Sequence, residues 1–180
     1  MKEDKILMKE FQDGNEESFE KLVIKYRNSA VYFSSRYTMD KYIAEDIVQE
    51  AFAYIYVYKD KYNEKHAFKT YLFTIIRNKS IDYIRKISNE SLNDDLNEIK
   101  SREDPEQKVL EKEKKSFILK KMNLLKEEYK TVIYLIDYEE FSYKEAAVIM
   151  NKNLASIKIL IFRARKKLKS LIEQEGYTVE

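Results

Sequence analysis

Two arginines and an asparagine recur along one face of the segment from residue 68 to residue 86, FKTYLFTIIRNKSIDYIRK. At helical pitch, Arg77, Asn78 and Arg85 share this face with Thr74 and Ile81. Guanidinium groups are permanent cationic donors, and an amide both donates and accepts, so the face suits phosphate oxygens and base edges. The same residues would also suit a solvated helix surface, and the rest of the chain has to decide between the two interpretations.

An apolar stripe on another side of this segment predicts the helix that positions the polar face. Its members recur three and four residues apart, the spacing that an amphipathic helix buries. They are Phe68, Tyr71, Leu72, Ile75, Ile76, Tyr83 and Ile84.

An acidic patch is predicted on the preceding helix, at residues 42–58, for which Asp40 is the expected N-cap. Asp46, Gln49 and Glu50 fall within about 100° of one another, opposite the apolar residues of that helix. Two carboxylates without a histidine or a third acid at ligand spacing do not predict a metal site. The patch is therefore either solvated surface or a contact for another protein.

The loop predicted between these helices, KDKYNEKHA at residues 59–67, is polar and rich in lysine. Tyr62, set among lysines, offers a ring on which an unpaired base can stack. His66 is the only histidine of the chain. A lone loop histidine is more typical of a surface residue than of a catalyst.

The C-terminal part of the chain predicts a helix-turn-helix. Ser142 and Glu145 form a capping box for a helix that runs to Met150. A four-residue turn follows at 151–154, where asparagine suits the left-handed position, and the last helix spans 155–172. Its outer face carries Lys158, Ile159, Phe162, Arg163, Lys166 and Lys169. Solvation does not explain the two large apolar residues on that face, which favours a binding surface over a basic tail helix.

Composition and charge predict an all-α protein with two small helical domains joined by a flexible linker. Two glycines and one proline in 180 residues indicate long helices with few breaks. The formal net charge is only +2, yet residues 88–104 contain six acids against two bases, and residues 158–169 contain six bases and no acid. We predict a first domain at 1–87, an acidic linker at 88–112 and a helix-turn-helix domain at 113–180.

Several function classes are disfavoured by what the sequence lacks. The absence of cysteine excludes disulfides and thiolate metal sites. The sequence also lacks a Gly-rich phosphate loop and a nucleophile paired with the histidine. We therefore expect that the protein is not an enzyme and that it binds no cofactor and no metal. The N-terminus has no apolar core of signal-peptide length, and the longest apolar run, 51–58, is too short to cross a bilayer. We therefore expect a cytoplasmic protein without direct membrane insertion.

Taken in order, these motifs resemble the extracytoplasmic-function (ECF) group of bacterial RNA polymerase sigma factors nearly end to end. AEDIVQEAF at residues 44–52 is similar to the family's helix that grips the clamp helices of the polymerase largest subunit. FKTYLFTIIRNKSIDYIRK is similar to the helix that opens and reads the minus-ten promoter element. Residues 125–168 are similar to the domain that binds the minus-thirty-five element. Three collinear motifs are far more specific than a single helix-turn-helix.

The resemblance implies a role for each residue that matches a family motif. For polymerase binding, the D-x-x-Q-E motif is matched by Asp46, Gln49 and Glu50. For the minus-ten element, the R-N-x-x-x-D-x-x-R pattern is matched by Arg77, Asn78, Asp82 and Arg85. For the minus-thirty-five element, the recognition helix is matched by Lys158, Phe162, Arg163 and Arg165, with Ser156, Ile159 and Lys166 expected beside them. The stacking partners expected for opened bases are Tyr62, His66, Phe68 and Phe73.

Three departures from the family pattern bear on promoter choice. Tyr71 stands where the family usually has tryptophan, and Lys126 stands where proline usually follows the leucine that opens the last domain. Ile159 and Leu160 occupy positions that are commonly small and basic. Ile159 faces outward, where it can pack on a thymine methyl group but cannot hydrogen-bond a guanine.

The resemblance further implies three partners: core RNA polymerase, promoter DNA and an anti-sigma protein that holds the chain inactive. The chief alternative is a helix-turn-helix regulator that binds DNA without polymerase. Such a regulator would need an interface for symmetric half-sites, and the sequence shows no leucine-rich seam of that kind. A helical adaptor that binds only proteins would leave the basic run at 158–169 without a use.

Overall fold

The computed structural model describes residues 2–91, 117–118 and 120–174, and helices are the only regular secondary structure in these ranges. This confirms the all-α prediction. The chain divides into two compact units, one centred on the first four α-helices and one on the last three. The predicted linker lies outside the described residues except for its first few positions, which continue a helix. Proline is tolerated at the first position of a helix, so we expect a helix to start at Pro105, and this position also lies outside the described residues.

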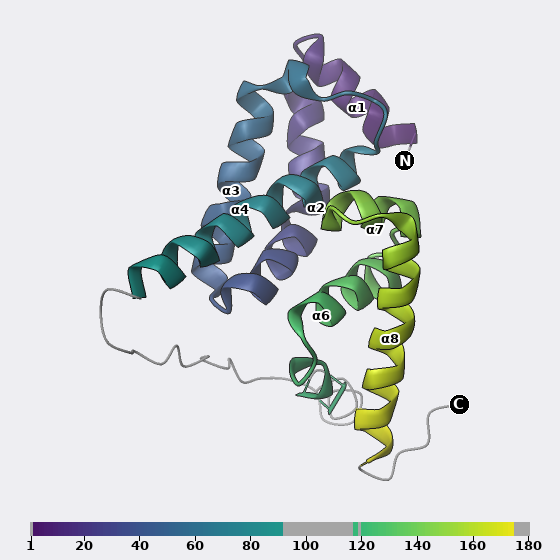
Figure 1. The fold of residues 1–180 in the computed structure, drawn as a ribbon. Helices are drawn as coiled ribbons and strands as arrows, with labels where there is room; N and C mark the ends of the chain where they lie inside the picture. Colours follow the sequence, from purple (N-terminus) through teal and green to yellow (C-terminus); the bar gives the residue numbers. More distant parts are fainter. Residues whose placement is uncertain (1, 92–116, 119, 175–180) are drawn as a thin grey trace. The chain divides into compact units, whose positions relative to one another are not determined.

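Four α-helices and one short 3-10 turn make up the first unit. They are α1 (Lys2–Gln12), α2 (Glu16–Thr38), α3 (Lys41–Val57), η1 (Lys59–Lys61) and α4 (Phe68–Ser91). Helix α2 packs against α1, α3 and α4, and α4 crosses both α2 and α3 (Figure 1). Helix α4 continues past residue 86, where its apolar stripe fades, because helical backbone needs no buried face once packing has fixed its start.

The core of the first unit is rich in phenylalanine. Phe33 of α2 and Phe73 of α4 are both fully buried, with ring centroids 5.0 Å apart. The hydroxyl groups of Ser34 and Ser80 lie 3.0 Å apart across the same helix pair, so the buried polar atoms satisfy each other. These contacts fix α4 on α2 and decide which face of α4 is left for solvent.

A buried carboxylate holds α1 to α2. Asp4 accepts hydrogen bonds from the Lys25 ammonium at 2.5 Å and from the Tyr26 hydroxyl at 2.8 Å. Burial opposes ionisation of Asp4, but the bonds from Lys25 and Tyr26 outweigh it and lower the pKa of the carboxyl group.

Residues 117–118 and 120–123 of the second unit are helical, and three further α-helices and a π-helical turn follow them. They are α6 (Glu127–Ile133), the π turn (Tyr134–Tyr138), α7 (Tyr143–Met150) and α8 (Leu154–Glu173). In the π turn, the backbone N–H of Glu139 donates to the carbonyl of Tyr134, five residues back. The Tyr134 hydroxyl also donates to the Glu139 carboxylate at 2.8 Å, which stabilises the wider turn.

Local capping signals predicted most helix starts correctly. Asp40 accepts hydrogen bonds from the backbone N–H groups of Tyr42 and Ile43. Ser142 and Glu145 form the expected reciprocal capping box, with backbone bonds of 2.9 and 3.3 Å. Asn15 occupies the N-cap of α2 as predicted, but its side chain makes no capping bond.

Candidate functional site

The acidic patch on α3 is exposed. Asp46, Gln49 and Glu50 all face solvent, while the opposite side of the helix is buried in the first unit. The Glu50 carboxylate accepts from the Lys79 ammonium of α4 at 2.8 Å. The patch is therefore partly neutralised at one end. This pairing could not be predicted from the sequence, because it depends on how α3 and α4 pack.

The polar face predicted on α4 is present, with differing exposure along its length. Asn78, Asp82 and Arg85 are exposed, whereas Arg77 is half-buried. The hydroxyl of Thr74 donates to the carbonyl of Thr70 at 2.8 Å. Asp82 and Arg85 form an ion pair of 3.8 Å, in which both side chains are about three-quarters exposed and therefore weakly coupled.

The aromatic residues expected to receive opened bases are mostly core residues, which corrects that prediction. Phe68 and Phe73 are fully buried, and Tyr62 is only 5% exposed. The Tyr62 hydroxyl donates to the carbonyl of His66 at 3.1 Å, and burial raises the pKa of this phenol to about 12. None of the three offers a ring face to a ligand, and only His66 of the expected group is exposed.

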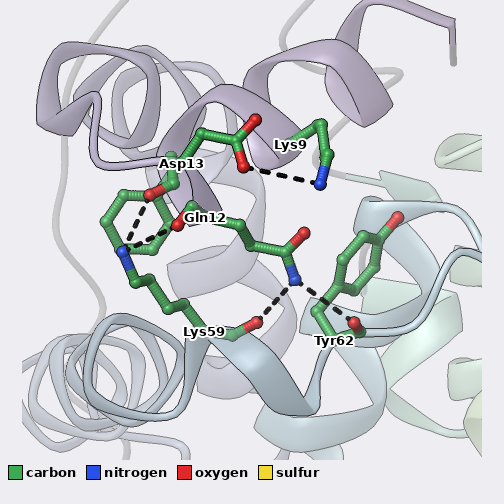
Figure 2. A network of polar contacts seen from close by, with 6 residues as sticks. Lys9, Gln12, Asp13, Lys59 and Tyr62 are labelled. Atoms are coloured by element: carbon green, nitrogen blue, oxygen red, sulfur yellow. Dashed lines mark hydrogen bonds and ion pairs between the residues drawn. The ribbon is translucent and has the colours of Figure 1, made fainter.

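A hydrogen-bonded clamp sets the position of the loop between α3 and α4 (Figure 2). The Gln12 side chain, at the end of α1, donates to the carbonyl oxygens of Lys59 at 2.9 Å and Tyr62 at 3.4 Å. In return, the Lys59 ammonium donates to the carbonyl oxygens of Phe11 at 3.2 Å and Gln12 at 3.0 Å. These contacts join backbone carbonyl groups at the end of α1 to η1, and those of Lys59 and Tyr62 in and after η1 to α1, so they tie the turn to the helix.

Beside this clamp lies an aromatic cluster that the loop prediction did not include. Tyr54 and Tyr58 of α3 have ring centroids 4.9 Å apart. The Lys61 ammonium lies 4.1 Å from the centroid of Tyr58 and 5.5 Å from that of Tyr54. Tyr71, in the first turn of α4, has its ring centroid 5.4 Å from that of Tyr62, and burial raises the pKa of its phenol. The spacing of Tyr54 and Tyr58, four residues apart, was the available sequence signal.

The helix-turn-helix of the second unit has the predicted geometry. Asn151 adopts the left-handed conformation with φ 51°, and Asn153 caps α8 by accepting from the backbone N–H of Ser156 at 2.8 Å. Lys158, Arg163 and Lys166 are exposed along the outer face of α8. Between them Ile159 is 52% exposed and Phe162 is 68% exposed.

Arg165 makes an ion pair within the second unit, so its guanidinium group has a protein partner in the free chain. Its guanidinium group donates to both carboxylate oxygens of Asp137, one through Nη2 and the other through Nε at 3.1 Å. This bidentate hydrogen bonding raises the pKa of Arg165. The ion pair ties α8 to the π turn, while half of the Arg165 side chain remains exposed beside its neighbours on α8.

Two absences can be stated for the described part of the chain. Among residues 2–91, 117–118 and 120–174, there is no group of three histidine, cysteine, aspartate or glutamate side chains that could hold a metal ion. In the same ranges, no helix is both long and apolar enough to cross a membrane.

Comparison with known sequences gives two family matches in chain order. Sigma-70 region 2 matches residues 22–90, and sigma-70 region 4 matches residues 118–168. The ECF RNA polymerase sigma factor SigM of Bacillus subtilis is 36% identical over 153 residues, covering 81% of this chain and 90% of the relative. The ECF RNA polymerase sigma-E factor of Escherichia coli is 26% identical over 181 residues, covering 94% of each chain.

Solved structures show the same fold. The sigma factor RpoE from Bartonella quintana, in complex with the anti-sigma factor NepR, matches with a TM-score of 0.73 and 27% identity. That match covers 86% of this chain and 96% of the other. CnrH, in complex with the cytosolic domain of CnrY, matches with a TM-score of 0.69 and 21% identity over 96% of this chain and 98% of the other, which shows similarity of fold alone.

Proposed function

Since the chain belongs to the ECF group of RNA polymerase sigma factors, we propose that it binds core RNA polymerase and directs it to promoters, where it opens the DNA and initiates transcription. The observation that carries this proposal is the presence, in one chain, of an exposed acidic patch on α3 and an exposed basic face on α8. Such a protein acts as a bridge between an enzyme and its template. It contributes binding energy and no catalytic group of its own.

The polymerase contact is assigned to Asp46, Gln49 and Glu50, which dock on the clamp helices of the largest polymerase subunit. Their exposure on one side of α3 supports this assignment, because a docking helix must present its polar residues outward while its other face stays in the core. Residues 1–87 then form the domain that holds polymerase and the minus-ten element, and 113–180 form the domain that binds the minus-thirty-five element. A partner of this kind also implies that the protein works in the cytoplasm.

The minus-ten contact is assigned to the polar face of α4, with Asn78 as its central donor and acceptor. Arg77, Asp82 and Arg85 flank it, and His66 lies exposed in the preceding loop. An amide can pair with a base edge, while the arginines position the backbone.

The minus-thirty-five contact is assigned to the outer face of α8 in the major groove. Lys158, Arg163 and Lys166 neutralise phosphates or reach guanine edges, and the exposed Ile159 and Phe162 pack on thymine methyl groups. Ser156, in the first turn and half-buried, is placed for a phosphate contact. We therefore expect a T-rich upstream element.

An anti-sigma protein is the third proposed partner. A similar structure is that of a sigma factor in complex with an anti-sigma factor. A protein that covers the acidic patch of α3 and the basic face of α8 would block both polymerase binding and DNA binding. One partner would then be sufficient to hold the chain inactive.

Reconstituted transcription tests the proposed function directly. Purified chain is added to core polymerase on genomic DNA fragments, and transcript start points are mapped. We expect discrete start points that core polymerase alone does not give. Initiation only at the background positions of core polymerase would contradict the proposal.

The alternative, a regulator that binds DNA without polymerase, is not favoured by the comparisons. It would bind a symmetric duplex site as a dimer. Size-exclusion mass and gel shift in the absence of polymerase distinguish it from the monomeric, polymerase-dependent binding expected here.

A further inference from the structure

We propose that α1 braces the loop at residues 62–67, with Gln12, Lys59 and Lys5 as positioning residues for recognition of the minus-ten element. The inference rests on the proposed function, because it explains how the loop that carries His66 takes one position beside α4. None of the contacts proposed above with polymerase or DNA uses α1, so the brace also gives this helix a task.

The start of the loop is held at the C-terminal end of α1 by donors on both elements (Figure 2). The Gln12 amide donates to the carbonyl oxygens of Lys59 at 2.9 Å and Tyr62 at 3.4 Å, so one side chain spans η1 from its first residue to the start of the loop. The Lys59 ammonium donates to the last two carbonyl oxygens of α1 at 3.2 and 3.0 Å. A helix C-terminus attracts a cation, which strengthens this second contact.

The middle of the loop is held nearer the N-terminus of α1. The Lys5 ammonium donates to the carbonyl oxygen of Glu64 at 3.0 Å. Lys5 and Gln12 are seven residues apart, which is about two helical turns, so both lie on the side of α1 that faces the loop. The loop is therefore tied to α1 at two points instead of hanging from a single contact.

Tyr62 carries this constraint to the end of the loop. Its hydroxyl donates to the carbonyl of His66 at 3.1 Å, and its side chain is almost fully buried. Its ring centroid lies 6.2 Å from that of Phe68 and 5.4 Å from that of Tyr71, both in the first turn of α4. The backbone position of His66, beside the start of α4, therefore depends on contacts that begin at Gln12.

The brace is itself fixed at both of its ends. Near its start, Asp4 accepts from Lys25 and Tyr26 of α2. Near its end, the ring of Phe11 stacks on that of Phe19 with centroids 4.5 Å apart. Because α2 also packs against α4, one frame holds both the loop and the polar face that follows it.

A fixed loop has two consequences for recognition. It loses less conformational freedom when DNA binds, which leaves more of the contact energy for binding. It also adapts poorly to a wrong base, whereas loop surfaces that can repack accept several partners. Release of the brace should therefore weaken opening at the correct minus-ten sequence and relax the discrimination against altered ones.

The double variant Gln12→Met, Lys59→Met tests the brace, because methionine keeps a long side chain and removes the donors. The first readout is proton NMR of the imidazole of His66 in the full chain. His66 is the only histidine, so its signals need no further assignment. We expect one set of sharp signals in the wild-type chain, and shifted or broadened signals in the double variant.

The second readout uses holoenzyme reconstituted from core polymerase and the full chain, on a promoter mapped with the wild-type chain. Permanganate reactivity of opened thymines is compared between the native minus-ten element and its single-base variants. Their ratio should fall by about 5-fold in the double variant, the factor that one net hydrogen bond supports. Core affinity and discrimination at the minus-thirty-five element should stay within about 2-fold, because neither involves the loop. A role in stability alone would leave the minus-ten ratio unchanged at a temperature where every variant is folded.

Lys9→Met is the matched control, since Lys9 lies on the same helix but pairs with Asp13 at 3.4 Å instead of with the loop. Lys59→Arg keeps a cationic donor at the end of α1 and should stay within about 2-fold of wild type in the minus-ten ratio. If the double variant does not fold, Lys5→Met removes only the contact with Glu64 and should change both readouts in the same direction, by less.

An unchanged His66 signal together with an unchanged minus-ten ratio would overturn the brace, and so would an equal change in Lys9→Met. If the wild-type chain directs no discrete initiation, the proposed function fails instead, and that result is seen before any variant is assayed.

Discussion

The two helices assigned to DNA carry their charge in different ways. On α4, Lys79 is paired with Glu50 and Arg85 with Asp82. On α8, Arg165 is paired with Asp137 and Lys169 with Glu173. Lys158, Arg163 and Lys166 form no ion pair with the described residues, and Ile159 and Phe162 stand exposed between them. Unpaired cations with apolar neighbours suit the dense phosphates and methyl groups of a duplex, whereas paired charges beside tyrosines suit a strand that polymerase already holds. The difference indicates a division of labour between duplex capture and strand opening.

The largest predicted effect is a loss of affinity for core polymerase, and it should follow from substitutions in the first unit but not from substitutions in the second. Asp46→Lys with Glu50→Lys should lower core affinity by about 100-fold or more, because each change places a cation where a carboxylate docks. Lys158→Glu with Lys166→Glu in α8 is the control and should leave core affinity within about 3-fold. Competition binding against labelled wild-type chain measures both. Near wild-type affinity in the first variant would remove α3 from the interface.

The next effect should appear in the salt dependence of promoter binding. Replacing Arg163 and Lys166 by alanine removes two phosphate contacts, so the slope of log affinity against log salt should fall by about 1.8. Arg85→Ala in α4 removes one cation instead of two, and should therefore lower the slope by no more than about 0.9. Holoenzyme binding to a mapped promoter at several salt concentrations tests this, and equal slopes for the two helices would contradict the division of labour.

A smaller effect concerns the acid stability of the first unit. The pKa of Asp4 is lowered in the folded state, so its contribution is present above its ordinary pKa of 3.8 and is lost as pH falls through the folded value. Asp4→Asn should therefore cost about 1–3 kcal/mol at pH 7 and progressively less below pH 3.8. Chemical denaturation of the full chain at several pH values measures the difference. A constant cost down to the lowest pH would show that the ion pair is not responsible.

The smallest effect is expected from the ion pair of the second unit. Asp137→Asn should cost only about 0.5–1 kcal/mol, because Arg165 and Asp137 are both partly exposed. Arg165→Ala should lower thermal stability by a similar amount and leave the promoter sequence preference unchanged. Selection of binding sequences from a randomised upstream element would detect a change of preference. Such a change would indicate that Arg165 contacts DNA.

Local signals in the sequence were sufficient to predict the helices and the exposed patches. Asp40 and the Ser142–Glu145 pair act within four residues of themselves, so their spacing alone predicts the caps. Helical pitch likewise places Asp46 and Glu50 outward without any knowledge of neighbouring helices.

Contacts between distant residues explain the predictions that failed. Tyr62 is buried because its loop is tied to Gln12, 50 residues earlier, and nothing in the loop sequence shows this. Arg165 is paired because a π turn presents Asp137, 28 residues earlier, to its guanidinium group. Phe73 is different, since it adjoins Leu72 and precedes Ile76 by one turn, so its place in the core was readable from the stripe.

The bond between Glu50 and Lys79 makes the two halves of the bridge thermodynamically reciprocal. In the proposed complex, a polymerase group that takes up the Glu50 carboxylate would release the ammonium group of Lys79, the residue after Asn78 in α4. By linkage, a phosphate that attracts the ammonium frees the carboxylate to the same extent. Seating on the enzyme and grip on the template therefore assist each other through a single exchange of partners.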